Sequence, residues 1–180
     1  MFKSLSLKVI IFGFIFTFFS SFGQSFFIGL FNPSVRDTLN ISHGQFGSIY
    51  ATATLLSSFL FIWVGKKIDD INVLRFALYV TVLLSFSCFF FSKISSIVFL
   101  FIAIFLMRFS GQGMMSHTAS TTISRYFTKS RGKALSIGWF GLSVAEFILP
   151  VTIIYLLTIY NWQNIWIFIS LLVLVFLPIA

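Results

Sequence analysis

Long apolar runs separated by short polar segments limit what this chain can fold into. Residues 9–19, 55–64, 73–91 and 165–180 contain almost no charged side chain. Roughly 20 consecutive apolar residues are enough for a helix to cross a bilayer. Only 9% of the residues are charged, whereas a soluble domain carries roughly 25%. The sequence therefore predicts an all-α integral membrane protein.

Six transmembrane helices are predicted in a single domain over residues 1–180, at about residues 9–31, 45–64, 73–91, 96–122, 133–159 and 162–180. Asn32-Pro33 is expected to end the first helix, and Ser42 with Gln45 has capping-box spacing before the second. Ser130 is expected to be the N-cap of the fifth. A cleaved signal peptide is disfavoured, because the first apolar run is too long for a signal core.

The basic residues predict the orientation of these helices, since cytoplasmic segments of membrane proteins are enriched in Lys and Arg. With the N-terminus inside, nine basic residues lie in inner segments, namely Lys3, Lys8, Lys66, Lys67, Arg75, Arg125, Lys129, Arg131 and Lys133. The outer segments hold only Arg36 and Lys93. We therefore expect a multi-pass protein of the cell inner (plasma) membrane, with both termini and the loops 65–72 and 123–132 in the cytoplasm. The dispersed charge does not indicate nucleic-acid binding.

Charged and polar residues inside the spans are the candidates for function, because such groups are costly in hydrocarbon and usually face a bundle interior or cavity. Arg108 and Glu146 are the charges deepest within spans, at similar predicted depths, and we expect them to interact. Gln112 lies one helical turn from Arg108. Gln24 and His117 lie on polar stripes of the first and fourth spans. These residues predict a solvated pathway bordered by spans one, four and five.

No enzyme activity, cofactor or metal site is predicted. Ser116 and His117 are adjacent, so on a helix their side chains point apart. The sequence has no phosphate-binding Gly-Lys-Ser/Thr loop, and its two histidines lack metal-ligand spacing. Small residues of the fifth span, Gly138 and Gly141, are suited to close helix packing.

Three segments resemble the major facilitator superfamily. Gly65-Lys66-Lys67-Ile68-Asp69 followed by Arg75 resembles the family's loop between spans two and three, which implies a conformational gate at Gly65, Asp69 and Arg75. Arg108-Phe109-Ser110-Gly111-Gln112-Gly113 resembles the motif of its fourth helix, which implies substrate or proton coupling by Arg108 and helix packing by Gly111 and Gly113. The segment from Gly138 to Pro150 loosely resembles the Gly/Pro motif of the fifth helix. Residues 125–135 are similar to the bacterial monocarboxylate and oxalate/formate-like branch.

The resemblance implies a six-helix bundle built from two three-helix inverted repeats, as the N-terminal half of a twelve-helix fold. The predicted function is secondary transport of small anionic organic solutes, such as monocarboxylates, by alternating access with H⁺ or another ion. Substrate binding or coupling is assigned to Arg108, Gln112, His117, Glu146 and Gln24. The expected partners are the lipid bilayer, the substrate and a second six-helix half. A transport-incompetent membrane fragment or assembly partner is the alternative.

Overall fold

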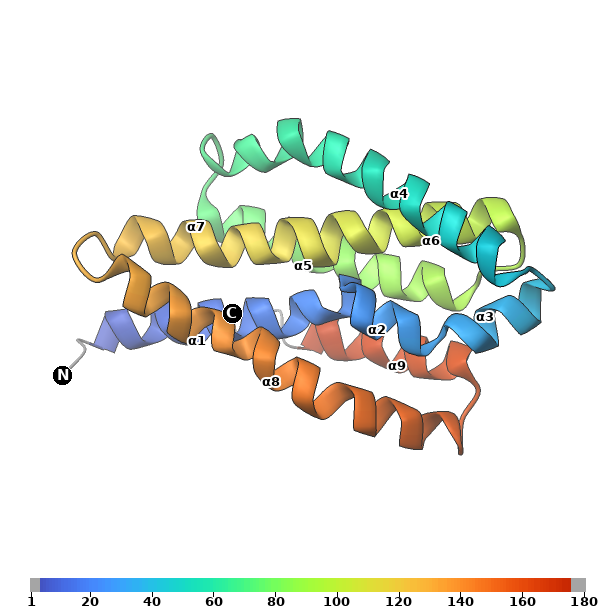
Figure 1. Ribbon diagram of the computed structural model, residues 1–180. Helices are drawn as coiled ribbons and strands as arrows, with labels where there is room; N and C mark the ends of the chain where they lie inside the picture. Colours follow the sequence, from blue (N-terminus) through green and yellow to red (C-terminus); the bar gives the residue numbers. More distant parts are fainter. Residues whose placement is uncertain (1–3, 176–180) are drawn as a thin grey trace.

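The computed structural model describes the backbone of residues 4–175 and the side chains of residues 6–175, and every regular element in this part is helical. Figure 1 shows the long helices lying side by side. In chain order they are α1 (Ser4–Ser20), η1 (Ser21–Gly23), α2 (Ser25–Leu30), α3 (Asn32–Leu39), α4 (His43–Val64), η2 (Gly65–Ile68), α5 (Val73–Ser92), α6 (Ile97–Met107), η3 (Arg108–Met115), α7 (Ser116–Tyr126), α8 (Arg131–Leu157) and α9 (Trp162–Val175).

Five stretches of the described chain are long and apolar enough to cross a membrane. They are Ser6–Gly23, His43–Ile68, Val73–Ser92, Ile97–Tyr126 and Arg131–Leu157. Helix α9 is apolar but shorter, with 14 described residues. Residues 176–180, the end of the sixth predicted span, lie outside the described part. Lys3, one of the basic residues predicted to lie in the cytoplasm, also lies outside it. The chain has the helical architecture of a multi-pass membrane protein.

The first span is not the continuous helix predicted for residues 9–31. The chain leaves helical geometry at Gln24 (φ −81°, ψ 155°) after the short 3₁₀ turn η1, and a new helix, α2, begins at Ser25. A helix does end just before Asn32-Pro33, since α2 stops at Leu30, but another helix that was not predicted, α3, begins at Asn32. Proline fits the first turn of a helix, where its missing N–H needs no partner.

The predicted caps had different outcomes. The capping box before α4 is confirmed, since the Gln45 backbone N–H donates to Ser42 Oγ (3.2 Å) and the Ser42 N–H donates to Gln45 Oε1 (2.8 Å). Ser130 does precede α8, but its side chain forms no capping hydrogen bond. The start of α8 therefore lacks a side-chain cap from that position.

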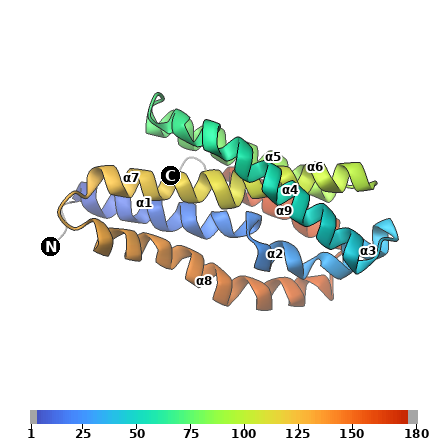
Figure 2. The same cartoon turned by 45° about the horizontal axis from the view of Figure 1, so that its top comes forward.

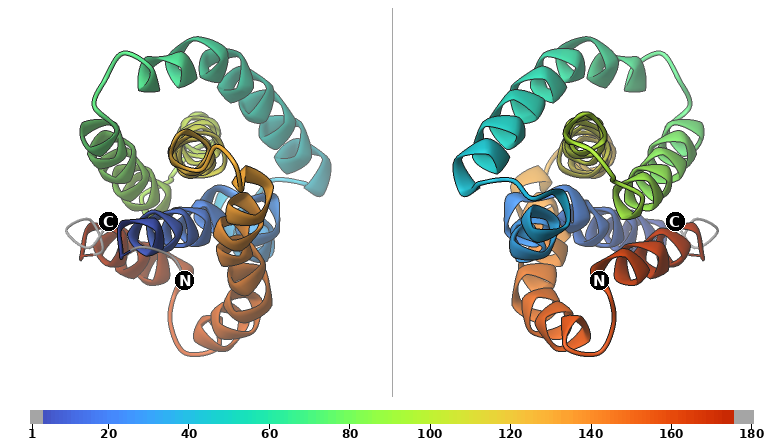
Figure 3. Two further views of the ribbon diagram at one scale, coloured as in Figure 1. Left: turned by 90° about the vertical axis from the view of Figure 1, so that its left-hand side faces the viewer. Right: turned by 90° about the vertical axis from the view of Figure 1, so that its right-hand side faces the viewer.

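The two most extensive helix pairs of the bundle are α1 against α8 and α5 against α9. In the second pair, Ser85 Oγ donates to the carbonyl oxygen of Ser170 at 2.9 Å. Aromatic rings of Phe27, Phe31 and Phe91 surround the fully buried Trp166. Figure 3, which looks along the bundle, shows α6 and α7 near its centre with the other long helices around them.

Helices α4 and α8 are the least covered of the candidate spans. Inside the structure, 11% of the α4 span and 17% of the α8 span are buried, against 44–50% for the other three. Both helices lie at the edge of the bundle in Figures 1 and 2. They therefore present wide faces to their surroundings.

Candidate functional site

Arg108 lies at the start of η3, where the fourth span meets the break in the first. Its side chain is buried (7% exposed), and Nη1 donates to the carbonyl oxygen of Gly23 at 3.0 Å and to Ser25 Oγ at 3.3 Å. The guanidinium carbon lies 5.4 Å from the centre of the Tyr50 ring. The backbone is extended at Gln24, so η1 ends at Gly23, and the Gly23 carbonyl accepts a hydrogen bond from Arg108.

The same contacts join three parts of the chain. The Tyr50 hydroxyl of α4 donates to Ser25 Oγ at 3.0 Å, and Ser25 also receives the bond from Arg108. A cation over an aromatic ring adds about 0.5–2 kcal/mol, with the larger value for desolvated pairs. Helix α4, the break in the first span and η3 are thus held around one guanidinium group.

The π-helical segment η3 makes a close backbone contact with η1. A Cβ atom added to Gly111 would lie 2.7 Å from both Cα and N of Gly23, so only glycine fits there without a shift of the backbone. Gly113 faces the Phe61 ring of α4. Short π-helical segments within α-helices are frequent at functional sites. This segment places Arg108 and Gln112 along one hollow.

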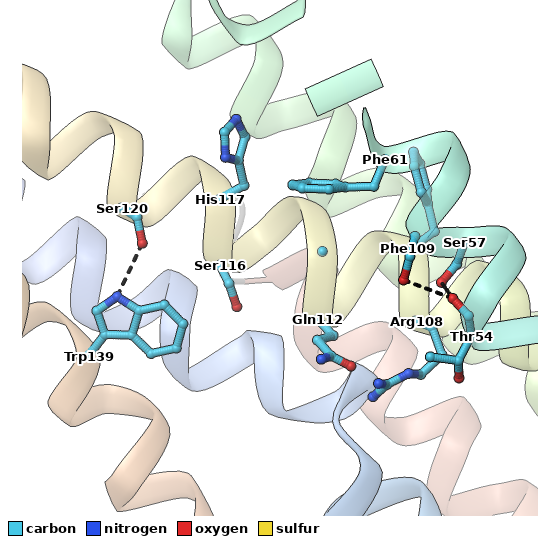
Figure 4. Close-up of a pocket in the computed structure, with 12 residues that line it drawn as sticks. Thr54, Ser57, Phe61, Arg108, Phe109, Gln112, Ser116, His117, Ser120 and Trp139 are labelled. Carbon is cyan, nitrogen blue, oxygen red and sulfur yellow. Dashed lines mark hydrogen bonds between the residues drawn. The ribbon is translucent and has the colours of Figure 1, made fainter. Parts of the chain in front are cut away.

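That hollow, named here the central cavity, has a volume of about 420 Å³. Figure 4 shows the residues that line it, which come from α4, η3, α7 and α8. They are Thr54, Ser57, Ser58, Phe61, Arg108, Phe109, Gln112, Gly113, Ser116, His117, Ser120 and Trp139.

Most of the buried polar atoms without a protein partner belong to residues that line the central cavity. Among the described residues, five buried side-chain polar atoms make no hydrogen bond, and four of them belong to this lining: Thr54 Oγ1, Arg108 Nε, Gln112 Oε1 and Ser116 Oγ. A buried polar group without a partner costs about 1–3 kcal/mol. The lining is therefore suited to a small ligand that both donates and accepts hydrogen bonds.

His117 lies at the end of the central cavity that is nearer the basic loops. Its Nε2 is 3.0 Å from the carbonyl oxygen of Gly65, at the end of α4, and its ring stands edge-on to Phe61 with centroids 5.3 Å apart. The imidazole thereby connects the cavity wall to the start of the segment that joins α4 to α5.

The family model described as Major Facilitator Superfamily matches residues 13–180, which include every element that lines the central cavity. The chain belongs to the Major Facilitator Superfamily. Proteins of this family are membrane transporters rather than enzymes. Searches against curated proteins and against solved structures gave no significant match.

In this Major Facilitator Superfamily chain, three of the five residues predicted to bind or couple substrate line the central cavity: Arg108, Gln112 and His117. The other two do not. Gln24 is half-buried at the break in the first span, and Glu146 is exposed on α8. Glu146 forms no ion pair in the described part of the chain. The expected Arg108–Glu146 interaction is absent from this conformation.

The walls of the cavity also differ from the predicted pathway of spans one, four and five. The polar stripe of the first span packs against α8 instead, where Thr17 Oγ1 donates to the Gly138 carbonyl at 2.7 Å. An added Cβ on Gly141 would meet the Phe14 carbonyl and Thr17 Oγ1 (2.5 Å). The second span takes the place of the first in the wall. Its signal in the sequence was the spacing of Thr54, Ser57, Ser58 and Phe61, which puts them on one helix face.

The loop that resembles the family's gate segment, residues 65–75, lies at the same end of the bundle as the loop 123–132. Asp69 forms an ion pair with Arg125, which also donates to the Ile68 carbonyl at 3.3 Å. Gly65 is buried, whereas Arg75 is exposed and has no ion pair among the described residues. Pro150 is half-buried inside α8. In residues 4–175, no group of three His, Cys, Asp or Glu side chains gathers as a metal site would require.

Proposed function

We propose that this chain takes part in secondary transport of small anionic organic solutes, with monocarboxylates as the expected class. The observation that carries the proposal is the unpaired Nε of Arg108 beside the unpaired Oε1 of Gln112 in a cavity of about 420 Å³. A cavity of this volume lies within the range of small-molecule sites.

The chemistry of the lining favours an anion that also carries a hydroxyl or a proton. Arg108 Nε can donate to a carboxylate oxygen, and a charge-assisted bond of this kind is roughly twice as strong as a neutral one. The Gln112 carbonyl accepts a hydrogen bond, and the Ser116 hydroxyl can donate or accept one. Coupling to H⁺ or another ion, as symport or antiport, is part of the proposal.

A second six-helix half is also proposed, facing α4 and α8. Support comes from the wide exposed faces of these two helices and from Glu146, which is exposed in the middle of α8. A charge in contact with lipid at mid-membrane costs about 2.5–3.5 kcal/mol on insertion scales, so a protein or aqueous surface there is more favourable. We further propose that the bundle consists of two inverted three-helix repeats, with both termini on the cytoplasmic side of the inner membrane.

Ligand-induced thermal stabilisation tests the proposed anion site. A ligand present at about 100 times its Kd stabilises the native state by about 2.7 kcal/mol. We expect lactate or a similar carboxylate to raise the melting temperature of the purified chain, and its amide analogue to have no effect. Arg108→Gln should abolish the shift, and Lys93→Gln, which removes an exposed charge outside the cavity, should retain it. Equal stabilisation by carboxylate and amide would contradict an anion site.

A further inference from the structure

Three hollows adjoin one another along the same side of the fourth span. A second hollow, of about 340 Å³, is lined by Ser120, Thr121, Ser124, Arg125 and Arg131, and shares Ser120 with the central cavity. A third, of about 350 Å³, shares His117 with the central cavity and Thr121 with the second hollow. We call the three together the polar groove.

The groove follows one stripe of the helix. Ser116, Ser120 and Ser124 of α7 are four residues apart, so their side chains project from one face. The Trp139 indole donates to Ser120 Oγ at 3.1 Å where the central cavity meets the second hollow (Figure 4). The stripe runs from the middle of the fourth span to its basic end. A solute in the central cavity therefore has a polar surface to follow to that end.

The charges along the groove are mostly positive. Four basic side chains line it, Lys66, Arg108, Arg125 and Arg131, against the single acid Asp69. Asp69 is paired with Arg125. Arg131 is exposed and has no ion pair in the described part of the chain. Clefts lined by one sign of charge concentrate ions of the opposite sign.

We infer that Arg131 is a selectivity residue at the mouth of the polar groove, where its free positive charge favours the passage of small anions over cations to and from the central cavity. This inference rests on the proposed function and adds to it a residue outside the central cavity. Arg125 is the weaker candidate for this role, because Asp69 offsets its charge.

Charge-dependent modification of a cysteine inside the groove tests the inference. The protein is the full chain with Cys88→Ala and Ser116→Cys, in nanodiscs of zwitterionic lipid. The measured quantity is the ratio of its reaction rates with an anionic and a cationic methanethiosulfonate reagent of similar size. The ratio cancels any effect of a substitution on the reactivity of the thiol itself.

Arg131→Gln should lower the anionic-to-cationic ratio about fourfold at low salt. Removing one charge about 10 Å from the path in water changes each rate roughly twofold, in opposite directions for the two reagents. The effect should largely disappear at 1 M salt, because the Debye length falls from about 30 Å at 0.01 M to about 3 Å. Ser124→Cys serves as a second reporter if Ser116→Cys does not fold.

Lys133→Gln is the matched control, since Lys133 is an exposed base on the same helix that lines none of the three hollows. It should leave the ratio unchanged. An equal fall with Lys133→Gln, or no fall with Arg131→Gln while the cysteine still reacts, would overturn the role of Arg131 and leave the cavity intact as a site. If the cysteine reacts with none of the three reagents, anionic, cationic or neutral, the polar groove is not an accessible pathway and the whole inference is refuted.

Discussion

Gly23→Ala should destabilise the fold through the contact between the broken first span and η3. A Cβ atom at this position would lie 2.6 Å from the backbone N of Gln112 and 2.7 Å from Cα of Gly111, and would also meet the Met107 carbonyl. These are backbone atoms, which cannot rotate away as a flexible side chain can. Gly23 has a negative φ, so the effect of alanine here is steric and not conformational.

Two costs add at this position. Forcing an extra methyl group into a packed contact typically costs about 1–3 kcal/mol. The separation of the two backbones would also stretch the bond from Arg108 Nη1 to the Gly23 carbonyl, now 3.0 Å, and a hydrogen bond to a charged group contributes about 1.5–3 kcal/mol. Because the bond would be lengthened and not lost, only part of the second cost applies, and we expect the free energy of unfolding to fall by about 2–4 kcal/mol.

The buried thiol of Cys88, the single cysteine of the chain, reports unfolding directly through a thiol-reactive dye. A loss of 1 kcal/mol lowers the melting temperature by about 2–4 °C in a chain of this length, so Gly23→Ala should melt at least about 4 °C lower. Gly47→Ala is the control: its Cβ meets nothing within 4 Å, and alanine is favoured over glycine in a helix by about 1 kcal/mol. Equal melting temperatures for the two variants would refute the tight backbone contact between Gly23 and η3.

Two further predictions concern helix packing and orientation. Thr17→Val removes the 2.7 Å bond to the Gly138 carbonyl and should lower the melting temperature by an amount equivalent to about 1 kcal/mol; Thr152→Val, which loses only an exposed bond within its own helix, should not. In a Cys88→Ala background, an impermeant thiol reagent should label Arg36→Cys in intact cells but Lys129→Cys only after the membrane is opened. The reverse labelling pattern would overturn the predicted orientation.

The lengths of the apolar runs predicted where the long helices lie, but not where they break. The extended geometry at Gln24 accompanies the contact between Gly23 and Gly111, which are far apart in the sequence and come together only in the folded bundle. No local pattern distinguishes Gly23 from a glycine that simply packs. The π-helical segment η3 contains the other side of this contact, Gly111, and its residues are individually compatible with an α-helix.

The candidate site was predictable where a residue type was costly in the membrane. Arg108 stood out for that reason, and Gln112 followed from helical spacing. Serine and threonine of α4 gave a weaker signal, because their hydroxyls can bond to their own helix, as Ser57 Oγ does to the Thr54 carbonyl at 2.8 Å. The depth of Glu146 along its span could be predicted by counting residues, but the direction of its side chain around the helix could not. The rotation of α8 is set by the packing of Gly141 against α1, which turns Glu146 outward.

Arg108 divides its hydrogen-bonding capacity between the fold and the site. Nη1 donates to the Gly23 carbonyl and to Ser25, whereas the buried Nε of this cavity-lining residue has no protein partner in the described part of the chain. Lysine carries the same charge on a single ammonium group without the planar fork of arginine, so Arg108→Lys can satisfy one of these directions but not both. If Arg108→Lys keeps its melting temperature but is no longer stabilised by a carboxylate, the bond to the Gly23 carbonyl has been retained. If its melting temperature also falls, that bond has been lost. Arg108→Lys therefore separates the structural role of this residue from its role in binding, which Arg108→Ala cannot do.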